Sequence, residues 1–209
     1  MSLAPALLLL WLTAPSAAPP ERIVALVPLG KVDPALVKLA VETLEARVAC
    51  RVRVEPEREL PKEAWYAPRK RWRAEKILDA IDREPPEGAW KVVGLTAAEI
   101  STTKGDIVDW RIGGLGEIGG RTCVVSTWIN ERRSKTRADL HKRITDLVAH
   151  EFGHTLGADH CETAGCVMRD AKGKLLESQD ASTSQFCEAC RKKLGDGVLK
   201  PAPATTATH

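Results

Sequence analysis

Residues 150–160 read His-Glu-Phe-Gly-His-Thr-Leu-Gly-Ala-Asp-His, and this run limits the fold of the chain more than any other. His150 and His154 are four residues apart, so a helix through the run directs both rings from one face. Gly157 is typical of a helix C-terminus, where the chain can turn sharply. Such a turn would return His160 to the same ion, so the sequence predicts one metal site with three imidazole ligands.

The residues before this run predict the helix that carries it. Apolar side chains recur at helical spacing between Ala138 and Leu156. The stripe expected to face the core comprises Leu140, Ile144, Leu147, Val148 and Thr155. His141 lies on the same helix, nine residues ahead of His150, and we expect it on the solvated face and not at the metal.

Three imidazoles leave a fourth position free for water, which is typical of a catalytic zinc site and not of a structural one. Glu151 follows the first histidine and would point toward that water. Zinc lowers the pKa of bound water to about 7, so a carboxylate can take its proton and later pass it to a leaving amine. The run therefore predicts a zinc-dependent hydrolase with His150, His154 and His160 as ligands and Glu151 as general base.

Four of the six cysteines form two close pairs after the predicted helix. They are Cys161, Cys166, Cys187 and Cys190, with four residues inside the first pair, two inside the second and twenty between the pairs. Four thiolates at short spacings can make a closed tetrahedral zinc site, which would stabilise a segment with few apolar residues. Two disulfides are the alternative if the protein is exported. Cys50 and Cys123 lie in predicted strands, where we expect buried free thiols, with a disulfide as the alternative.

The run from His150 to the last cysteine resembles the archaemetzincin family of zinc metallopeptidases, of the metzincin clan. The shared pattern joins the histidine run to Cys161, then to Cys166-Val167-Met168, and then to the Cys187 and Cys190 pair, over about forty residues. Eighteen residues separate Met168 from Cys187, where the family usually has seventeen. A one-residue insertion in a loop explains this difference and affects no ligand.

The resemblance implies a metzincin-like α+β fold. Its upper lobe would be of the α/β type, with a twisted, mostly parallel sheet, packed helices and the active-site helix, and its lower lobe would be small, irregular and held by zinc. Cys161, Cys166, Cys187 and Cys190 would bind a structural zinc, which gives two zinc ions per chain. Met168 would be the methionine of the Met-turn, an apolar base beneath the catalytic zinc, and a plain core residue is the alternative. A peptide or protein substrate would bind extended in the cleft, along the edge strand.

The remaining elements follow from apolar runs and their boundaries. We expect strands at Ile23–Leu29, Val52–Val54, Trp90–Leu95, Asp106–Ile112 and Thr122–Trp128, and helices that begin at Asp33-Pro34 and near Trp72, the second ending near Ile81. Gly113–Gly120 leads into a strand, which favours a hairpin-type connection over a phosphate-binding loop. The basic run Arg69–Arg73 is interpreted as a solvated helix face.

Composition limits the partners and leaves rival functions open. A net charge of +3, with 28% charged residues, gives no basic field that would suit a nucleic acid. We expect a monomer that acts on peptides. A zinc amidase acting on cell-wall or other amide bonds is one alternative, and an inactive zinc-stabilised binding module is another, although an intact Glu151 argues against inactivity.

The two ends of the chain predict processing and disorder. Residues 1–18 form a short apolar stretch followed by small residues, which is typical of a signal peptide, so we expect an exported protein, periplasmic or extracellular, without a membrane anchor after cleavage. A cytoplasmic protein is the alternative. We expect one metallopeptidase domain over 19–200, with the upper lobe at about 19–157 and the lower at about 158–200. Residues 201–209 are Pro, Ala and Thr with one His, and predict a disordered tail.

Overall fold

The computed structural model describes residues 21–201. The predicted signal peptide and all but the first residue of the predicted tail lie outside the described residues, so both stay predictions. None of the described helices combines the length and the apolarity that crossing a bilayer would require.

The described chain contains both strands and helices as far as residue 155, and only helices follow. The strands are β1 (Ile23–Leu29), β2 (Arg51–Val54), β3 (Trp65–Tyr66), β4 (Arg71–Arg73), β5 (Lys91–Thr96), β6 (Ile100–Lys104), β7 (Ile107–Ile112), β8 (Gly114–Gly116) and β9 (Thr122–Ser126). The helices are α1 (Pro34–Arg47), α2 (Ala74–Arg83), α3 (Trp128–Arg133), α4 (Arg137–Thr155), α5 (Leu175–Ala181) and α6 (Glu188–Leu194), with two short 3-10 helices at Lys62–Ala64 and Ala67–Arg69.

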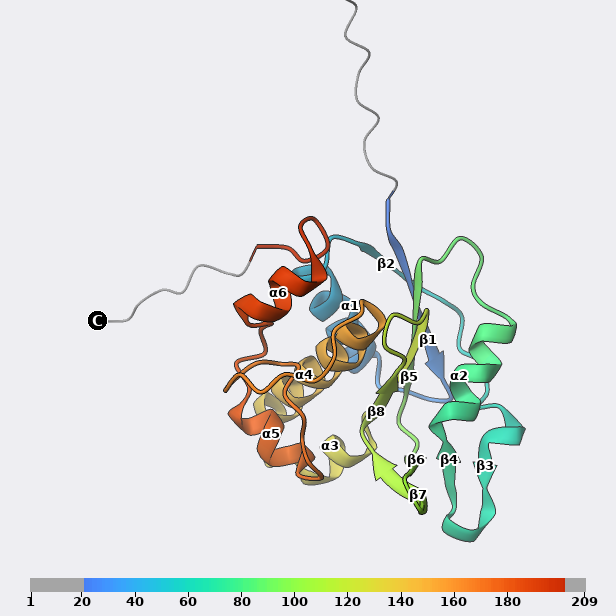
Figure 1. Ribbon diagram of the computed structural model, residues 1–209. Helices are drawn as coiled ribbons and strands as arrows, with labels where there is room; N and C mark the ends of the chain where they lie inside the picture. The colour runs from blue at the N-terminus through green and yellow to red at the C-terminus, as the bar shows by residue number, and fades with distance from the viewer. Residues whose placement is uncertain (1–20, 202–209) are drawn as a thin grey trace, which may run out of the picture.

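The larger sheet has the strand order β2-β1-β5-β9-β8. Its first four strands run parallel, and β8 pairs antiparallel with β9, as the register Leu115 to Val124 shows. The glycine-rich segment is therefore a hairpin-type connection, as predicted, although it contains the short strand β8. This strand lies at the edge of the sheet and next to α4 (Figure 1).

A smaller sheet, with the order β3-β4-β6-β7, was not predicted in full, because only β7 had been expected there. β6 and β7 form an antiparallel hairpin at one side of it. From β7 the chain passes through Gly113 directly into β8, so one continuous segment forms the edge of both sheets.

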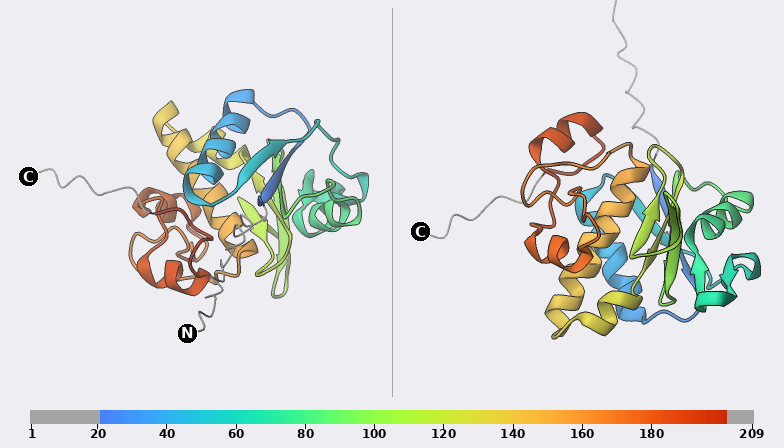
Figure 2. Two further views of the ribbon diagram at one scale, coloured as in Figure 1. Left: turned by 90° about the horizontal axis from the view of Figure 1, so that it is seen from above. Right: turned by 60° about the horizontal axis from the view of Figure 1, so that its bottom comes forward.

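Helices cover both faces of the larger sheet. α1 and α4 pack on one face, in a cluster that contains Leu26 and Phe152, and α2 packs on the other, against Ala25 and Val124. Figure 2 shows α2 and α4 on opposite sides of the strands. Successive residues of a strand point to opposite faces, so a strand buried on both sides reads as a continuous apolar run, as β1 does.

α4 confirms the helix predicted from Ala138 to Leu156 and has defined ends. At its start the Thr136 hydroxyl accepts from the Asp139 N–H, and the Asp139 carboxylate accepts from the Thr136 N–H, both at 3.1 Å. At its end the Lys91 ammonium donates to the carbonyl of Thr155 at 2.6 Å. Of the predicted core stripe only Leu140 is half-buried, and the other four residues are buried.

Residues 21–157 form what we call the sheet region, and residues 158–201 form the cysteine region. The end of the cysteine region returns to the end of α1, where the Lys200 N–H donates to the Arg47 carbonyl at 2.8 Å and the Ala49 N–H donates to the Val198 carbonyl at 2.9 Å. Figure 1 shows α6 beside α1, and Figure 2 shows the cysteine region next to α4. The two regions therefore meet along α1 and α4.

Three local predictions were wrong. The basic run Arg69–Arg73 is not part of a helix, because it forms a turn and the strand β4, and Arg71 lies between Glu99 at 3.3 Å and Asp109 at 3.5 Å. His141 is half-buried and not on a solvated face. Cys50 lies between α1 and β2 and is half-buried, whereas Cys123 is buried in β9 as expected.

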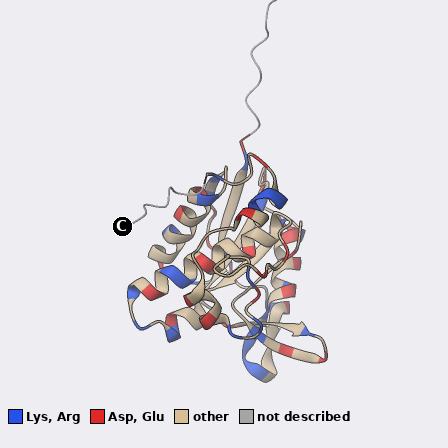
Figure 3. Ribbon diagram, turned by 60° about the vertical axis from the view of Figure 1, so that its left-hand side comes forward, with Lys and Arg blue, Asp and Glu red and all other residues tan. Residues whose placement is uncertain are grey.

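Charged residues of both signs occur along the helices and loops (Figure 3). Five of the thirteen ion pairs among the described residues join two exposed groups, such as Lys38 with Glu42 at 3.7 Å. Pairs of this kind contribute little to stability. The distribution agrees with the modest net charge of the sequence.

Candidate metal and active site

The last turns of α4 bring His150 and His154 together. Their Nε2 atoms are 3.1 Å apart, and the ligand atoms of both lie within 4.8 Å of that of His160. Gly157 follows the helix with φ of 100°, a conformation that favours glycine, and so allows the chain to reverse toward His160. Two nitrogens bound to one tetrahedral zinc at about 2.0–2.1 Å would be about 3.3 Å apart, so this spacing fits a shared ion.

Backbone carbonyls fix the tautomers of the two helical histidines. The Nδ1 of His150 lies 2.8 Å from the carbonyl of Val167, and the Nδ1 of His154 lies 2.8 Å from that of Ala158. A carbonyl oxygen only accepts, so each Nδ1 must carry the proton and each Nε2 presents a lone pair to the cluster. Burial lowers the pKa of His150 to about 4, which keeps its ring neutral, the form that binds metal.

Glu151 lies beside the histidines with only 6% of its surface exposed. Burial raises the pKa of its carboxyl to about 8, against a lowering effect of a hydrogen bond from the Gly116 backbone. β8 can approach this side chain only because it carries glycine: a Cβ on Gly114 would lie 2.4 Å from the Glu151 Cγ. The edge strand therefore covers the acidic side chain closely.

Met168 is fully buried beneath α4. A Cβ on Gly153 would lie 2.4 Å from the Met168 sulfur, so the thioether contacts the helix backbone between His150 and His154. The side chain thus forms an apolar base under the histidine cluster. The sequence suggested two interpretations of Met168, a Met-turn residue and a plain core residue. This buried position is compatible with both.

The four cysteines of the cysteine region form a second cluster. Their sulfurs all lie within 4.8 Å of one another, with Cys161 and Cys187 at 3.7 Å and Cys166 and Cys190 at 3.8 Å. Two sulfurs bound to one tetrahedral zinc at about 2.3 Å would be about 3.8 Å apart, whereas a disulfide would hold them at about 2.05 Å. The spacing therefore fits a four-thiolate metal site and not two disulfides.

A cavity of about 770 Å³ opens beside the histidine cluster. One wall is the edge formed by β7 and β8, another is the face of α4 from Asp146 to His154, and a third is the segment from Arg169 through α5. The three histidines and Glu151 all line this cavity. The candidate metal site is thus open to a ligand as long as a short peptide.

The sequence interpretation missed several residues of this cavity. Asp146 lies four residues before His150, and helical spacing alone could have placed it there. Gln179 and Ser182 come from α5 and the residue after it, and no local pattern indicated that this segment returns to α4. Trp110 lies where β7 faces Gly173 of the cysteine region, 3.5 Å from a Cβ placed on that glycine.

Comparison with known proteins identifies similar chains. The model of peptidase family M54 matches residues 51–196. An archaemetzincin of Halobacterium salinarum is 27% identical over 176 residues, which cover 81% of this chain and 97% of that protein. One of Haloarcula marismortui is 27% identical over 185 residues, covering 82% and 98%.

Solved structures agree with these sequence matches. The archaemetzincin of Archaeoglobus fulgidus, crystallised in complex with malonate, has a TM-score of 0.67 and 26% identity, and the match covers 82% of this chain and 99% of that one. The archaemetzincin of Methanopyrus kandleri has a TM-score of 0.68 and 27% identity, with coverages of 83% and 93%. The fold described above is therefore shared over nearly the full length of both.

Proposed function

Because this chain belongs to peptidase family M54, the archaemetzincins, and is a zinc metallopeptidase, we propose that it hydrolyses peptide bonds with Glu151 as general base and with zinc bound by His150, His154 and His160. The observation that carries the proposal is the convergence of three imidazole nitrogens within 4.8 Å, beside a buried carboxylate, in the wall of an open cavity. When bound there, zinc supplies a Lewis acid that polarises a carbonyl and acidifies water.

The side chains of this chain would then divide the remaining work. The Glu151 carboxylate accepts a proton as water attacks the scissile carbonyl, and returns it to the amine that leaves. The glycine at position 114 keeps β8 close to Glu151, so substrate backbone laid along this edge strand would pass the carboxylate. The carbonyls of Val167 and Ala158 hold the two imidazoles in their metal-binding tautomer.

Substitution of Glu151 by Gln tests the assigned role. Glu151→Gln keeps the shape and removes the base, so we expect peptide hydrolysis to fall by at least about 100-fold. Zinc content per chain should stay unchanged, because Glu151 is not proposed as a ligand. His154→Ala is the matched control. It should lose the zinc at the histidine cluster, and with it the activity, in a protein that remains folded. Retention of more than a few per cent of activity by Glu151→Gln would contradict the proposal.

The same assay separates the rival activities. Peptides and cell-wall fragments offered side by side to zinc-loaded protein should show cleavage of the peptides. Cleavage of the cell-wall fragments alone would favour the amidase, and binding without turnover would favour the inactive module.

We also propose a second, structural zinc bound by Cys161, Cys166, Cys187 and Cys190. The sulfur spacings support it, because they fit a tetrahedral ion. Metal analysis should give two zinc ions per chain. One zinc per chain together with four unreactive, oxidised cysteines would establish the disulfide alternative.

Export and a monomeric state remain proposals that rest on the sequence. If residues 1–18 are a signal peptide, protein from its native host should begin near residue 19, which N-terminal sequencing measures. Protein that retains Met1 or Ser2 would reject export. Sedimentation of the purified protein tests the monomer.

A further inference from the structure

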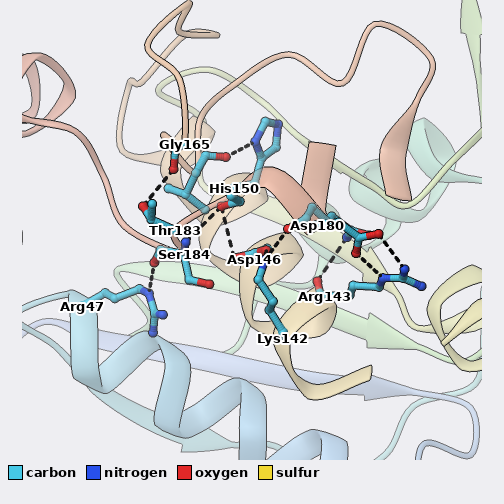
Figure 4. Close-up of polar contacts among 12 residues, drawn as sticks. Arg47, Lys142, Arg143, Asp146, His150, Gly165, Asp180, Thr183 and Ser184 are labelled. Atoms are coloured by element: carbon cyan, nitrogen blue, oxygen red, sulfur yellow. Dashed lines mark hydrogen bonds and ion pairs between the residues drawn. The ribbon is translucent and has the colours of Figure 1, made fainter. Parts of the chain in front are cut away.

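The cavity extends from the histidine cluster toward the start of α4. Asp146 lies four residues before His150 and so on the same helix face, about 6 Å further along the axis. Figure 4 shows Lys142, Asp146 and His150 on successive turns of α4. A side chain of a bound peptide that entered here would start beside the proposed zinc site and point toward Asp146.

Apolar side chains bound the entrance to this end of the cavity. Leu147 of α4 and Leu175 of α5 both lie close to Gly113, at 3.2 Å and 2.8 Å from a Cβ placed on that glycine. Ile129 of α3 lines the same cavity. The walls therefore suit the methylene stem of a long side chain, and Gly113 allows the two leucines to pack closely against the β7–β8 edge.

Polar side chains form the far end, which we call the polar floor and which consists of Asp146, Gln179 and Ser182. The Ser182 hydroxyl donates to Asp146 Oδ1 at 3.3 Å and accepts from the Ser184 N–H at 3.0 Å, so its own donor is used. Asp146 is only 3% exposed. Its carboxylate can accept further hydrogen bonds, because two oxygens offer about four lone-pair sites.

Gln179 contributes an acceptor without a partner. It is 5% exposed, and its Nε2 donates to the Arg143 carbonyl at 3.1 Å. That carbonyl cannot donate, so the amide cannot be reversed, and Oε1 has no hydrogen-bond partner among the described residues. A buried acceptor left unpaired costs about 1–3 kcal/mol, so a donor that reached it would be bound favourably.

The cations that contact the polar floor or the residues beside it are already engaged. The Lys142 ammonium donates to Asp146 Oδ2 at 3.0 Å and to the Gln179 carbonyl. The Arg143 guanidinium pairs with Asp180 at 2.9 Å, and the Arg47 guanidinium donates to the Ser184 carbonyl at 3.0 Å (Figure 4). The polar floor consequently offers acceptors to a ligand, while most of its donors are used within the protein.

We propose that this end of the cavity selects, next to the scissile bond, a long side chain that carries hydrogen-bond donors at its tip, namely glutamine, lysine or arginine. The inference rests on the proposed peptidase function. Glutamate has the same length as glutamine, but its ionised tip only accepts, so it would face Asp146 and Gln179 Oε1 without a bond. Norleucine fills the apolar entrance and leaves the floor unpaired.

A peptide series that differs at one position tests the proposal. Peptides with glutamine, lysine, norleucine or glutamate on either side of the scissile bond are compared by kcat/KM with the zinc-loaded enzyme. We expect glutamine and lysine to exceed norleucine by about 10-fold, and glutamate by about 100-fold, at one of the two positions. Equal rates for glutamine and glutamate at both positions would overturn it.

Gln179→Met identifies the residue responsible. The variant keeps side-chain length and removes the free acceptor, so the preference for glutamine over norleucine should fall to about 2-fold or less. Gln185→Met is the control, because Gln185 lies in the same region and does not line the cavity, and it should keep the wild-type preference. A general loss of stability would lower all rates together and leave the ratio unchanged, so an unchanged ratio in Gln179→Met overturns the assignment.

Binding separates this inference from the proposed function. Dissociation constants of the same peptides for the Glu151→Gln protein, measured by calorimetry, should follow the same order without any turnover. If the wild type cleaved no peptide but the dissociation constants followed this order, the peptidase function would be rejected and the proposed side-chain preference would stand. Cleavage with no order in rates or in binding would reject the pocket and keep the peptidase.

Discussion

The sheet region and the cysteine region are held together by different means. The sheet region supplies 26 of the 32 buried apolar residues of the core, and the cysteine region supplies six, two of which are cysteines. The first region can be stabilised by apolar burial alone. The second is too poor in apolar residues for that, and the proposed zinc at four sulfurs within 4.8 Å of one another would replace the missing core.

The proposed active site lies where these two regions meet. α4 of the sheet region carries His150, Glu151 and His154, while the cysteine region supplies His160 and the Met168 side chain. Unfolding of either region should therefore abolish catalysis, but through different routes. The following experiments separate those routes.

Loss of one sulfur should have the largest effect. Cys190→Ser removes a proposed ligand that is only 6% exposed, so we expect the cysteine region to unfold, zinc to fall to one per chain or fewer, and activity to disappear. Cys50→Ser is the control, since Cys50 is half-buried and belongs to neither cluster, and it should change little. Amide hydrogen exchange over residues 158–201 measures the unfolding. If Cys190→Ser kept the wild-type protection from exchange there, the cysteine region would not depend on the sulfur cluster.

A chelator should distinguish the two clusters next. Three neutral imidazoles in an open cavity should release zinc at a lower chelator concentration than four thiolates in a closed cluster. We expect one zinc and all activity to be lost first, with little change in circular dichroism. The second zinc should leave only together with structure. Simultaneous release of both ions would show that the two regions are not independent.

Shortening one buried side chain in the sheet region should lower the free energy of unfolding without changing the zinc content. Leu26 in β1 is fully buried, so Leu26→Ala should lower the free energy of unfolding by about 3 kcal/mol. Zinc content and kcat at 25 °C should remain near those of the wild type, because Leu26 does not line the cavity. Denaturant titration and metal analysis measure the two quantities. Loss of either zinc from the folded variant would mean that the core and the metal sites are coupled.

The smallest effect concerns a contact between the two regions. Arg47 of α1 donates to the Ser184 carbonyl at 3.0 Å, and Arg47→Ala should lower stability by about 1 kcal/mol and increase proteolysis near Ser184. Arg51→Ala removes an exposed ion pair with Glu21 at 3.7 Å and should have almost no effect. Equal effects of the two substitutions would show that the contact contributes nothing specific.

The sequence was informative where structure is local. The predicted bounds of α4, the start of α1 at Asp33-Pro34 and the strands β1, β5 and β9 depend on residues near one another in the chain, and the structure confirms them. The clustering of His150, His154 and His160 also needs only one helix and one turn. Short spacing along the chain therefore allowed both clusters to be predicted from the sequence.

Elements that depend on distant contacts were missed. β6 reads Ile-Ser-Thr-Thr-Lys and β8 reads Gly-Leu-Gly, so neither has the apolar alternation that predicts a strand. β8 forms because Gly114 tolerates contact with Glu151, which lies 37 residues later in the chain. Gln179 reaches the cavity because α5 packs on α4, and its own neighbours in the sequence do not indicate this.

One short segment has a consequence for how such chains can diverge. Cys166, Val167 and Met168 are consecutive, yet they contact the sulfur cluster, His150 and the backbone of α4 respectively. An insertion or deletion among these three residues would displace at least one of the contacts, so we expect their spacing to be invariant in relatives. The stretch between Met168 and Gln185, whose carbonyl accepts from the Val167 N–H at 2.8 Å, is less restricted, and the resemblance noted in the sequence places one additional residue between Met168 and Cys187. Since this stretch contains Gln179, a change in its length would alter the proposed side-chain preference while both clusters stay intact.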